Sequence, residues 1–377
     1  MKSMKIKDII CYCPPKNKTR FGETRSVIAK VITDGGIEGI GEGTISFPMC
    51  LSSQVVSAIM GTKEYLIGAD SRQIEKIWAD LYDRFFWSGG PVELHAQGAI
   101  NHALWDILGK SCGIPVFQFF GGMLHDRLPV YHNGWWKGAN TPEEVVQKAI
   151  AIVEAGATRL KWYPFEFLPQ LQNNHQLSLS DINRAVGEVI AVREAVGPGV
   201  ELMVDVWRRL NIASAVQFCQ GVESAGLVFV EEAIPAENLD SMITLSKSVR
   251  VRLACGERII SRYDFSKLFE ARAIGIAQIN VSRVGGLSEA RKIATMADNY
   301  DISVAPHNPT GALATSAAVH LCATLRNFSL LERFVPFSDP WIADNLSYGP
   351  DYVEVPTLPG LGITLDEKYL QKYLVAE

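Results

Sequence analysis

The 377-residue sequence predicts an α/β fold, in which a parallel βα barrel follows a smaller α+β domain. Apolar, strand-like runs alternate with helical stretches over residues 126–344. Single polar residues follow these runs at a near-constant interval, and Asp205, Glu231 and Glu257 are 26 residues apart. A repeat of this length is typical of a barrel, whose active site forms at the carboxyl ends of its strands.

Residues 1–125 show a different pattern, with strands first and helices afterwards. RSVIAKVIT and IEGIGEG flank the sequence Asp34-Gly35-Gly36, which predicts a β-hairpin with a glycine turn. Apolar residues at helical spacing then predict helices over 71–86 and 95–113. This order is typical of a small α+β domain. The segment 345–377 adds no barrel unit, and we expect it to pack back against this domain.

Eight strands with seven clear intervening helices are expected in the barrel, over residues 126–344. The predicted strands are 128–133, 158–164, 200–207, 227–235, 252–258, 274–281, 301–309 and 327–333. Continuous apolar runs such as LVFV fit strands that are buried on both faces. The long connection 163–180 fits either a functional lid or a plain excursion of the chain.

Composition excludes several classes of function. The net charge of −5 provides no basic surface for nucleic acid. No apolar run reaches the length of a membrane span, and the first residues lack the apolar stretch of a signal peptide. The seven cysteines are scattered and odd in number, so we expect reduced thiols in a cytoplasmic protein.

Three carboxylates on consecutive strands indicate a metal site. Asp205, Glu231 and Glu257 would meet at one end of the barrel. Buried together, they would repel one another and lose hydration unless a cation lay between them. Oxygen-only ligation favours Mg²⁺ or Mn²⁺ over Zn²⁺. For any one of them alone, a helix cap or a solvated charge would be the simpler interpretation.

Two further residues flank this triad. Lys161 lies on the predicted second strand and His307 on the seventh. In a closed barrel these strands stand on opposite sides of the metal, so a substrate between them would have a candidate acid or base on each face. Taken singly, Lys161 could be a surface lysine and His307 a loop histidine with its hydrogen bonds satisfied.

With these residues in view, the sequence resembles the enolase superfamily, and within it the mandelate racemase-like group. The resemblance spans nearly the whole chain. It rests on the segments ALWDILGKSCGIPVFQFFGG, LKWYP, MVDVW, FVEEAIPAE, CGERIISRYDF, QINVSRVGGLSEARKIATMADNY, APHNPTGA and LLER. It implies a modified (β/α)8 TIM barrel, (β/α)7β, over residues 126–344. An α+β capping domain would be formed by 1–125 and completed by about 345–377.

The resemblance also implies roles for the polar residues. Asp205, Glu231 and Glu257 would bind one Mg²⁺. Family chemistry begins with removal of the proton α to a carboxylate, and metal and hydrogen-bond donors stabilise the enolate that forms. His307 matches the strand-seven base, and Lys161 matches the first lysine of the strand-two K-x-K motif. Glu332 matches the strand-eight acid, which would have to be protonated to donate to a substrate carboxylate.

Three positions depart from the family pattern. Asn280 replaces the strand-six aspartate that partners the strand-seven histidine, so His307 should be a weaker base or act as a donor. Tyr163 replaces the second lysine of K-x-K; it could exchange protons only if its pKa were lowered, for which Lys161 and Mg²⁺ are candidates, and a packed tyrosine is the alternative. Trp207 stands where galactonate dehydratases carry a histidine that assists loss of hydroxide.

These features favour a lyase or isomerase that acts on a sugar-derived carboxylate. Loss of hydroxide would make it an acid-sugar dehydratase, and loss of a tethered ring oxygen would make it a cycloisomerase for lactones or anhydro-sugar acids. A barrel that binds metal and acid sugar without turnover is the alternative from another class. Racemisation is disfavoured because the second lysine is absent.

The sequence also offers candidates for the substrate pocket and an expectation about the assembly. Arg20, Phe21, Trp135 and Trp207, together with Trp136, are candidates to line the pocket. Tryptophans near a carbohydrate stack on its C–H face, although they also serve as core residues. The family resemblance implies a homo-oligomer, either a dimer or an octamer.

Overall fold

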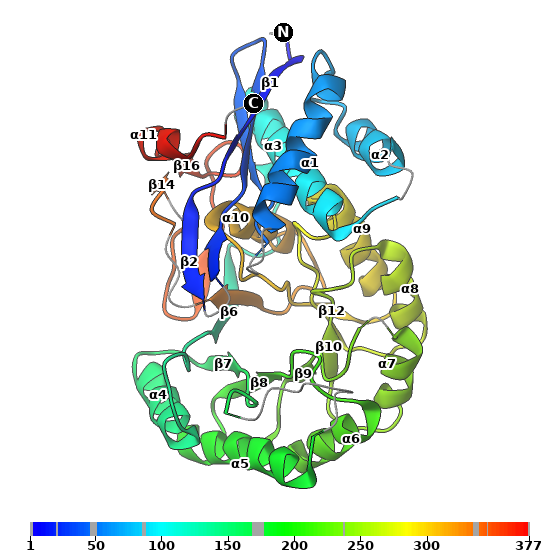
Figure 1. The fold of residues 1–377 in the computed structure, drawn as a ribbon, viewed down its shortest axis with the longest axis vertical. Coiled ribbons are helices and arrows are strands. Elements are labelled where there is room, and N and C mark those ends of the chain that lie inside the picture. The colour runs from blue at the N-terminus through cyan, green and yellow to red at the C-terminus, as the bar shows by residue number, and fades with distance from the viewer. Residues whose placement is uncertain are drawn as a thin grey trace.

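The computed structural model has a sheet-and-helix cap at one end and a barrel at the other (Figure 1). It describes residues 3–19, 22–45, 51–84, 88–167, 177–236, 238–334, 339–344 and 346–375. Both chain termini lie at the capped end. The order of elements therefore follows the order predicted from the sequence, with the α+β part first and the barrel second.

The first part of the chain is built on a three-stranded antiparallel sheet of order β1-β4-β5. Its strands are β1 (Ile6–Tyr12), β4 (Ile28–Thr33) and β5 (Glu38–Glu42), and a separate ribbon is formed by β2 (Pro15–Thr19) and β3 (Gly22–Arg25). The backbone N–H of Thr33 donates to the carbonyl of Ile37 across the turn at 3.0 Å. The predicted hairpin is therefore confirmed.

Helices α1 (Leu51–Leu66) and α3 (Pro91–Cys112) cover this sheet, and α2 (Ile74–Arg84) packs against α3. The sequence analysis predicted the last two and missed α1. Helix α3 lies directly on β5, because a Cβ added at Gly39 or Gly41 would fall 2.1 or 2.0 Å from a carbonyl oxygen of the helix. The glycines of the IEGIGEG segment thus permit a close approach that larger residues would block.

Eight parallel strands form the barrel, in the order β12-β11-β10-β9-β8-β7-β6-β13. They are β6 (Arg127–Asn133), β7 (Arg159–Trp162), β8 (Glu201–Asp205), β9 (Phe229–Glu231), β10 (Leu253–Cys255), β11 (Ile276–Ala277), β12 (Ser303–Val304) and β13 (Leu331–Phe334). A parallel bridge between Val304 and Phe328 joins β12 to the segment before β13. This bridge closes the barrel.

Helices surround the strands and apolar side chains fill the interior. The outer helices are α4 (Pro142–Glu154), α5 (Leu179–Val196), α6 (Ile212–Gly221), α7 (Leu239–Ser246), α8 (Arg262–Glu270), α9 (Leu287–Asp298) and α10 (Ala312–Cys322). The interior cluster is Tyr131, Met203, Phe229, Ala254, Ile276, Ala305 and Leu330. Because side chains pack the interior, ligands can bind only at its mouth.

The chain after the barrel contacts both parts of the molecule. It forms β14 (Ile342–Asp344), β15 (Tyr352–Glu354), β16 (Thr364–Leu365) and α11 (Glu367–Leu370). Strand β15 pairs antiparallel with β6 of the barrel, whereas Leu374 bridges to Tyr12 in β1. The exact domain boundaries stay a prediction.

Three short 3₁₀ helices, η1 (Val116–Phe120), η2 (Glu223–Ala225) and η3 (Gln371–Tyr373), complete the secondary structure of the described residues. None of the helices in this part of the chain has both the length and the apolar character that a bilayer span requires. The six cysteines that the structure describes are free thiols.

Candidate active site

Seven polar side chains from seven strands come together at the carboxyl end of the barrel. Lys161 lies in β7, Asp205 and Glu231 end β8 and β9, and Glu332 lies in β13. Glu257, Asn280 and His307 follow β10, β11 and β12. Asp205 and Glu231 are register partners in the sheet, so the sequence repeat corresponds to neighbouring positions in space.

The three predicted metal ligands carry an excess of buried negative charge. Glu231 is 0% exposed and Glu257 5% exposed. Burial raises the pKa of Glu231 well above its usual range; Lys161 opposes the shift and Asp205 adds to it. Burial likewise raises the pKa of Asp205 to about 6, with Lys161 opposing and Glu257 adding. Burial also opposes ionisation of Glu257, but His307 and Arg283 outweigh it and lower its pKa to about 2. A cation between the three carboxylates would relieve the repulsion among them.

The donor set fits a hard divalent cation. In the part of the chain that the structure describes, no three acidic, histidine or cysteine side chains already form a cluster that could hold a metal ion. Instead, the Lys161 ammonium contacts Glu231, and the Arg258 guanidinium contacts Glu257 and Glu232. Oε1 of Glu231 is buried and has no hydrogen-bond partner. An orphaned carboxylate oxygen among oxygen donors is what Mg²⁺ would satisfy.

Backbone strain is concentrated beside these carboxylates. Among the described residues, five non-glycine residues have positive φ, and three of them follow Asp205 or Glu231: Trp207 at 50°, Arg208 at 54° and Glu232 at 42°. The Arg208 N–H donates to the Glu232 carbonyl at 2.6 Å, which joins the two strained segments. Strain of about 1–3 kcal/mol per residue is retained mainly at functional sites.

Lys161 lies between two carboxylates. Its side chain is fully buried, and its Nζ lies 2.9 Å from Glu332 Oε1 as well as in contact with Glu231. Burial disfavours the ammonium, but the charges of Glu231 and Glu332 outweigh it and raise the pKa of Lys161 well above its usual range. A cation on Glu231 would remove part of this stabilisation and ease loss of the lysine proton.

Glu332 differs from the family pattern in the direction of its pKa. The family role required a protonated carboxyl group. Burial does oppose ionisation, but Lys161, His307 and hydrogen bonds from Asn308 and Asn133 outweigh it and lower the pKa of Glu332. The Asn308 N–H donates to Oε2 at 2.6 Å. In this arrangement Glu332 is an acceptor that positions Lys161, and not a donor.

Asn280 determines which nitrogen of His307 carries a proton. The Asn280 side-chain oxygen accepts from the backbone N–H groups of Ser282 and Arg283, both at 3.1 Å, so its NH₂ group must point the other way. That NH₂ group lies 3.0 Å from Nδ1 of His307 and donates to the His307 carbonyl at 3.2 Å. Nδ1 must therefore accept, and the proton of the neutral ring lies on Nε2.

His307 is consequently a neutral hydrogen-bond donor. Its Nε2 lies 2.5 Å from Glu257 Oε2. Burial lowers the pKa of His307, Glu257 opposes this shift and Arg283 adds to it. Accepting a proton would place an N–H on Nδ1 against the Asn280 NH₂ group, at a cost of about 1–3 kcal/mol for the lost bond. This geometry favours the alternative donor role over the base role implied by the family pattern.

Tyr163 fits the alternative of a packed tyrosine better than that of an acid or base. Burial raises the pKa of its phenol to about 12, although Arg209 opposes this shift. Its ring packs edge-on against Trp207, with 6.1 Å between centroids, and Arg209 lies over Trp207. Lys161 therefore does not lower the pKa of Tyr163, which remains a protonated phenol and a packed side chain. Trp207 occupies the barrel mouth as part of this cluster.

Trp135 is a core side chain that donates a hydrogen bond to the backbone of β7. It is 9% exposed, and its indole N–H donates to the carbonyl of Lys161 at 2.9 Å. It packs against Trp136 and Trp162 in the main core. This position explains how the Lys161 backbone is fixed, and substrate contact by Trp135 stays a prediction. Arg20 and Phe21 lie outside the described residues.

Sequence reasoning missed two arginines. Arg258 contacts Glu232 and Glu257, while Arg283 donates from Nη1 to the Glu257 carbonyl at 2.8 Å. Both arginines lie in segments that carry the family resemblance, CGER and SRVGG. These motifs could have identified them as site residues. Together they hold the Glu257 carboxylate and its backbone.

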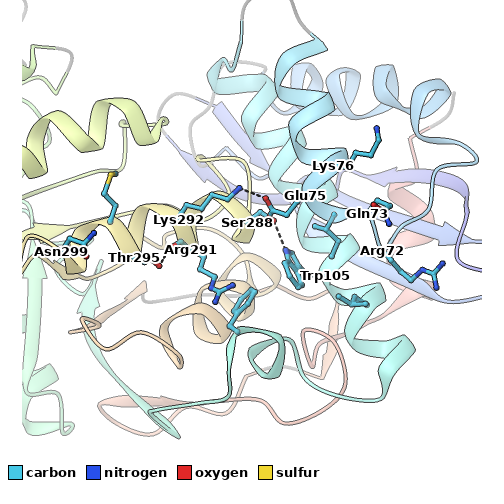
Figure 2. Close-up of a pocket in the computed structure, with 14 residues that line it drawn as sticks. Arg72, Gln73, Glu75, Lys76, Trp105, Ser288, Arg291, Lys292, Thr295 and Asn299 are labelled. Atoms are coloured by element: carbon cyan, nitrogen blue, oxygen red, sulfur yellow. Dashed lines mark hydrogen bonds and ion pairs between the residues drawn. The ribbon is translucent and has the colours of Figure 1, made fainter.

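A separate groove of about 700 Å³ lies on the outer side of the molecule, where α2 and α3 meet α9 (Figure 2). Lys292 pairs with Glu75 at 2.5 Å, and the Trp105 indole N–H donates to Ser288 Oγ at 3.2 Å. These contacts connect the capping helices to the barrel. We therefore interpret the groove as part of the interface between the two.

Comparisons with known proteins identify the family. Residues 144–369 match the model of the enolase C-terminal domain-like family, and residues 15–121 match the N-terminal domain of mandelate racemase and muconate lactonizing enzyme. The chain belongs to the enolase superfamily, in its mandelate racemase-like group. The fold predicted from the sequence, a modified TIM barrel with an N-terminal capping domain, is thereby confirmed.

Two relatives of this superfamily member share the name D-galactonate dehydratase. The chain is 32% identical to a D-galactonate dehydratase from Ralstonia nicotianae, with 91% of this chain and 89% of the relative covered. It is also 32% identical to a D-galactonate dehydratase from Pectobacterium atrosepticum, with 97% and 93% covered.

Solved structures agree with this placement. An enolase superfamily member from Salmonella Typhimurium has a TM-score of 0.92 at 26% identity, covering 99% of this chain and all of that one. A mandelate racemase/muconate lactonizing enzyme from a Sulfitobacter species has a TM-score of 0.89 at 26% identity, covering 98% and 96%.

Proposed function

We propose that this superfamily member removes the proton α to the carboxylate of a sugar acid and then expels the β-hydroxyl group, as an Mg²⁺-dependent acid-sugar dehydratase. Relatives named D-galactonate dehydratase support the reaction class. The polar groups at the strand ends support the chemistry. Trp207, at the position where galactonate dehydratases carry a histidine, argues that the substrate differs from D-galactonate.

Asp205, Glu231 and Glu257 would hold the Mg²⁺. The ion would offset the negative charge that develops on the substrate carboxylate as the α-proton leaves. Arg283 and Arg258 would keep Glu257 in place while Trp207 and Arg208 hold the strand ends in their strained conformation. The single observation that carries the metal proposal is the buried, unpartnered Oε1 of Glu231.

Lys161 is the proposed base. Tyr163 stays protonated at neutral pH, and the Asn280 amide disfavours uptake of a proton by His307. The C–H bond breaks, its proton goes to neutral Lys161, and its electron pair forms the enediolate. When the Cβ–O bond breaks, the Lys161 ammonium returns the proton to the departing oxygen, and water leaves.

His307 is the proposed hydrogen-bond donor to the developing oxyanion. A neutral imidazole with its proton on Nε2 can donate without itself ionising. Its contact with Glu257 places that N–H at the edge of the proposed metal site. Asn280 would thus be a positioning residue that fixes the donor tautomer.

Ring opening is a second candidate. Trp207 stands where related dehydratases carry a histidine that assists loss of hydroxide, and it can neither give nor take a proton. A tethered ring oxygen needs less assistance than hydroxide as it leaves. This observation favours a cycloisomerase of lactones or anhydro-sugar acids, and the same Lys161 and His307 roles would serve it.

One screen tests the proposal. Sugar acids and their lactone or anhydro forms are incubated with protein and Mg²⁺ in D₂O, and product and α-deuterium are followed by NMR. We expect a 2-keto-3-deoxy product from at least one open-chain acid. Product only from cyclic forms would establish the cycloisomerase. Binding without exchange or product, with every acid, would overturn the proposal and favour a non-catalytic binding barrel.

A further inference from the structure

A cavity of about 920 Å³ lies between the capping helix α3 and the loops that follow β9, β10 and β11. Glu257, Arg258 and Arg283 form its wall on the barrel side, and His95 and Ile45 line it from the capping side. The volume is in the range of small-molecule sites. Glu257 lines the cavity and also belongs to the proposed metal site, so the cavity adjoins that site.

His95, which lines this cavity, has an unused hydrogen-bond acceptor. Its side chain is 4% exposed, and its Nδ1 lies 2.5 Å from the Pro91 carbonyl oxygen. Since a carbonyl oxygen only accepts, Nδ1 carries the ring proton. Burial, with Arg283 adding to it, lowers the pKa of His95 to about 3, so the ring is neutral. Nε2 is then an acceptor, and it is buried without a partner.

The neighbouring donors are already engaged. Arg283 donates to the Glu257 carbonyl, and Arg258 contacts Glu232 and Glu257. A buried acceptor without a partner costs about 1–3 kcal/mol. A ligand in the cavity can supply the missing donor if it carries an O–H or N–H group, since a carboxylate cannot donate.

We propose that Nε2 of His95 accepts a hydrogen bond from a hydroxyl group of the substrate that is remote from the reacting carbons. This inference rests on the proposed function, because it places the substrate carboxylate at the strand ends and its polyhydroxy tail in the cavity. His95 would then be a specificity residue contributed by the capping domain. A site with a buried polar group discriminates strongly against analogues that lack the matching group.

A matched control lies on the same helix. His102 is also fully buried, both of its ring nitrogens lack a partner, and burial lowers its pKa to about 3. It is two turns further along α3 and does not line the cavity. His102→Leu therefore reports what loss of a buried imidazole does to the helix, without touching the cavity.

The experiment compares His95→Leu, His95→Gln and His102→Leu with the unmodified enzyme. The substrates are a six-carbon aldonate that is turned over and its monodeoxy analogues. We expect His95→Leu to lower kcat/KM for the full aldonate at least about tenfold. For one remote deoxy analogue His95→Leu should have little effect, so the discrimination against that analogue disappears. His95→Gln, which keeps an acceptor, should preserve part of it, and His102→Leu should preserve all of it.

Two outcomes overturn the inference. One is an equal loss for every substrate with His95→Leu, and the other is the same loss of discrimination with His102→Leu. Thermal unfolding of each variant separates either result from simple destabilisation. If the unmodified protein turns over no acid sugar, the proposed function fails; the same comparison made with calorimetric affinities for the aldonate and its deoxy analogues still decides the role of His95.

Discussion

The two flanks of the barrel mouth differ in the groups that surround their titratable side chains, Lys161 and His307. On the β7 flank, the Lys161 ammonium is surrounded by carboxylates, Glu231 and Glu332, whose charge a bound cation would change. On the β12 flank, His307 is held by an amide, Asn280, whose orientation is fixed by two backbone N–H groups. This difference is the reason for the proposal that Lys161 transfers the proton and that His307 is a fixed hydrogen-bond donor.

The largest effect should come from the group shared by the metal site and the lysine flank. Glu231→Gln removes one charge from the proposed metal site and from Lys161. Because Mg²⁺ contributes several kcal/mol of charge stabilisation, we expect activity to fall at least about 10³-fold. Steady-state kinetics with a titration of Mg²⁺ measures it. Full activity without added metal would refute the metal site.

Exchange of the α-proton for deuterium distinguishes the roles of the two flanks. Lys161→Arg keeps the positive charge but removes the base, so we expect loss of both α-deuterium exchange and product formation by about 10²–10⁴-fold. His307→Gln keeps a donor, so exchange should remain measurable and the loss should stay below that of Lys161→Arg. NMR in D₂O follows both. Exchange that survives in Lys161→Arg and vanishes in His307→Gln would reverse the assignment.

Metal and pH should be linked through Asp205. Its pKa is raised to about 6 by burial, so the metal-free protein binds more protons than the unfolded chain near pH 5. This contribution to stability is fully present below the usual carboxyl pKa and is lost as pH rises through 6. Stabilisation by Mg²⁺ should therefore grow between pH 5 and 7. Thermal unfolding with and without Mg²⁺ measures it, and Asp205→Asn should reduce the pH dependence.

The smallest effect is expected at the tyrosine that follows Lys161. Tyr163→Phe removes a phenol that is already protonated and packed, so kcat should change less than about tenfold and its pH dependence should not move. A pH–rate profile measures both. A loss comparable to that of Lys161→Arg would give Tyr163 a direct part in proton transfer.

The sequence predicted the barrel well because strand ends recur at a fixed interval. Asp205 and Glu231 are register partners, as their spacing indicated. Helix α1 was missed although Val55, Val56, Ile59 and Leu66, all buried, follow a helical period.

Protonation states could not be predicted because they depend on contacts far apart in the chain. Glu332 is an ionised acceptor since Lys161 and Asn308 surround it. The His307 tautomer depends on the backbone N–H groups of Ser282 and Arg283, which only the folded loop brings to Asn280. Residue types alone carry no information about which side of an amide faces a ring.

The tautomer of His307 tests the central claim most directly. NMR of ¹⁵N-histidine-labelled protein, with His307→Gln for assignment, reports which ring nitrogen carries the proton. We predict a proton on Nε2 and none on Nδ1, with no conversion to imidazolium near the usual histidine pKa. Asn280→Asp should move the proton to Nδ1 and raise the pKa of His307. A proton on Nδ1 in the unmodified protein would contradict the account and return His307 to the role of base.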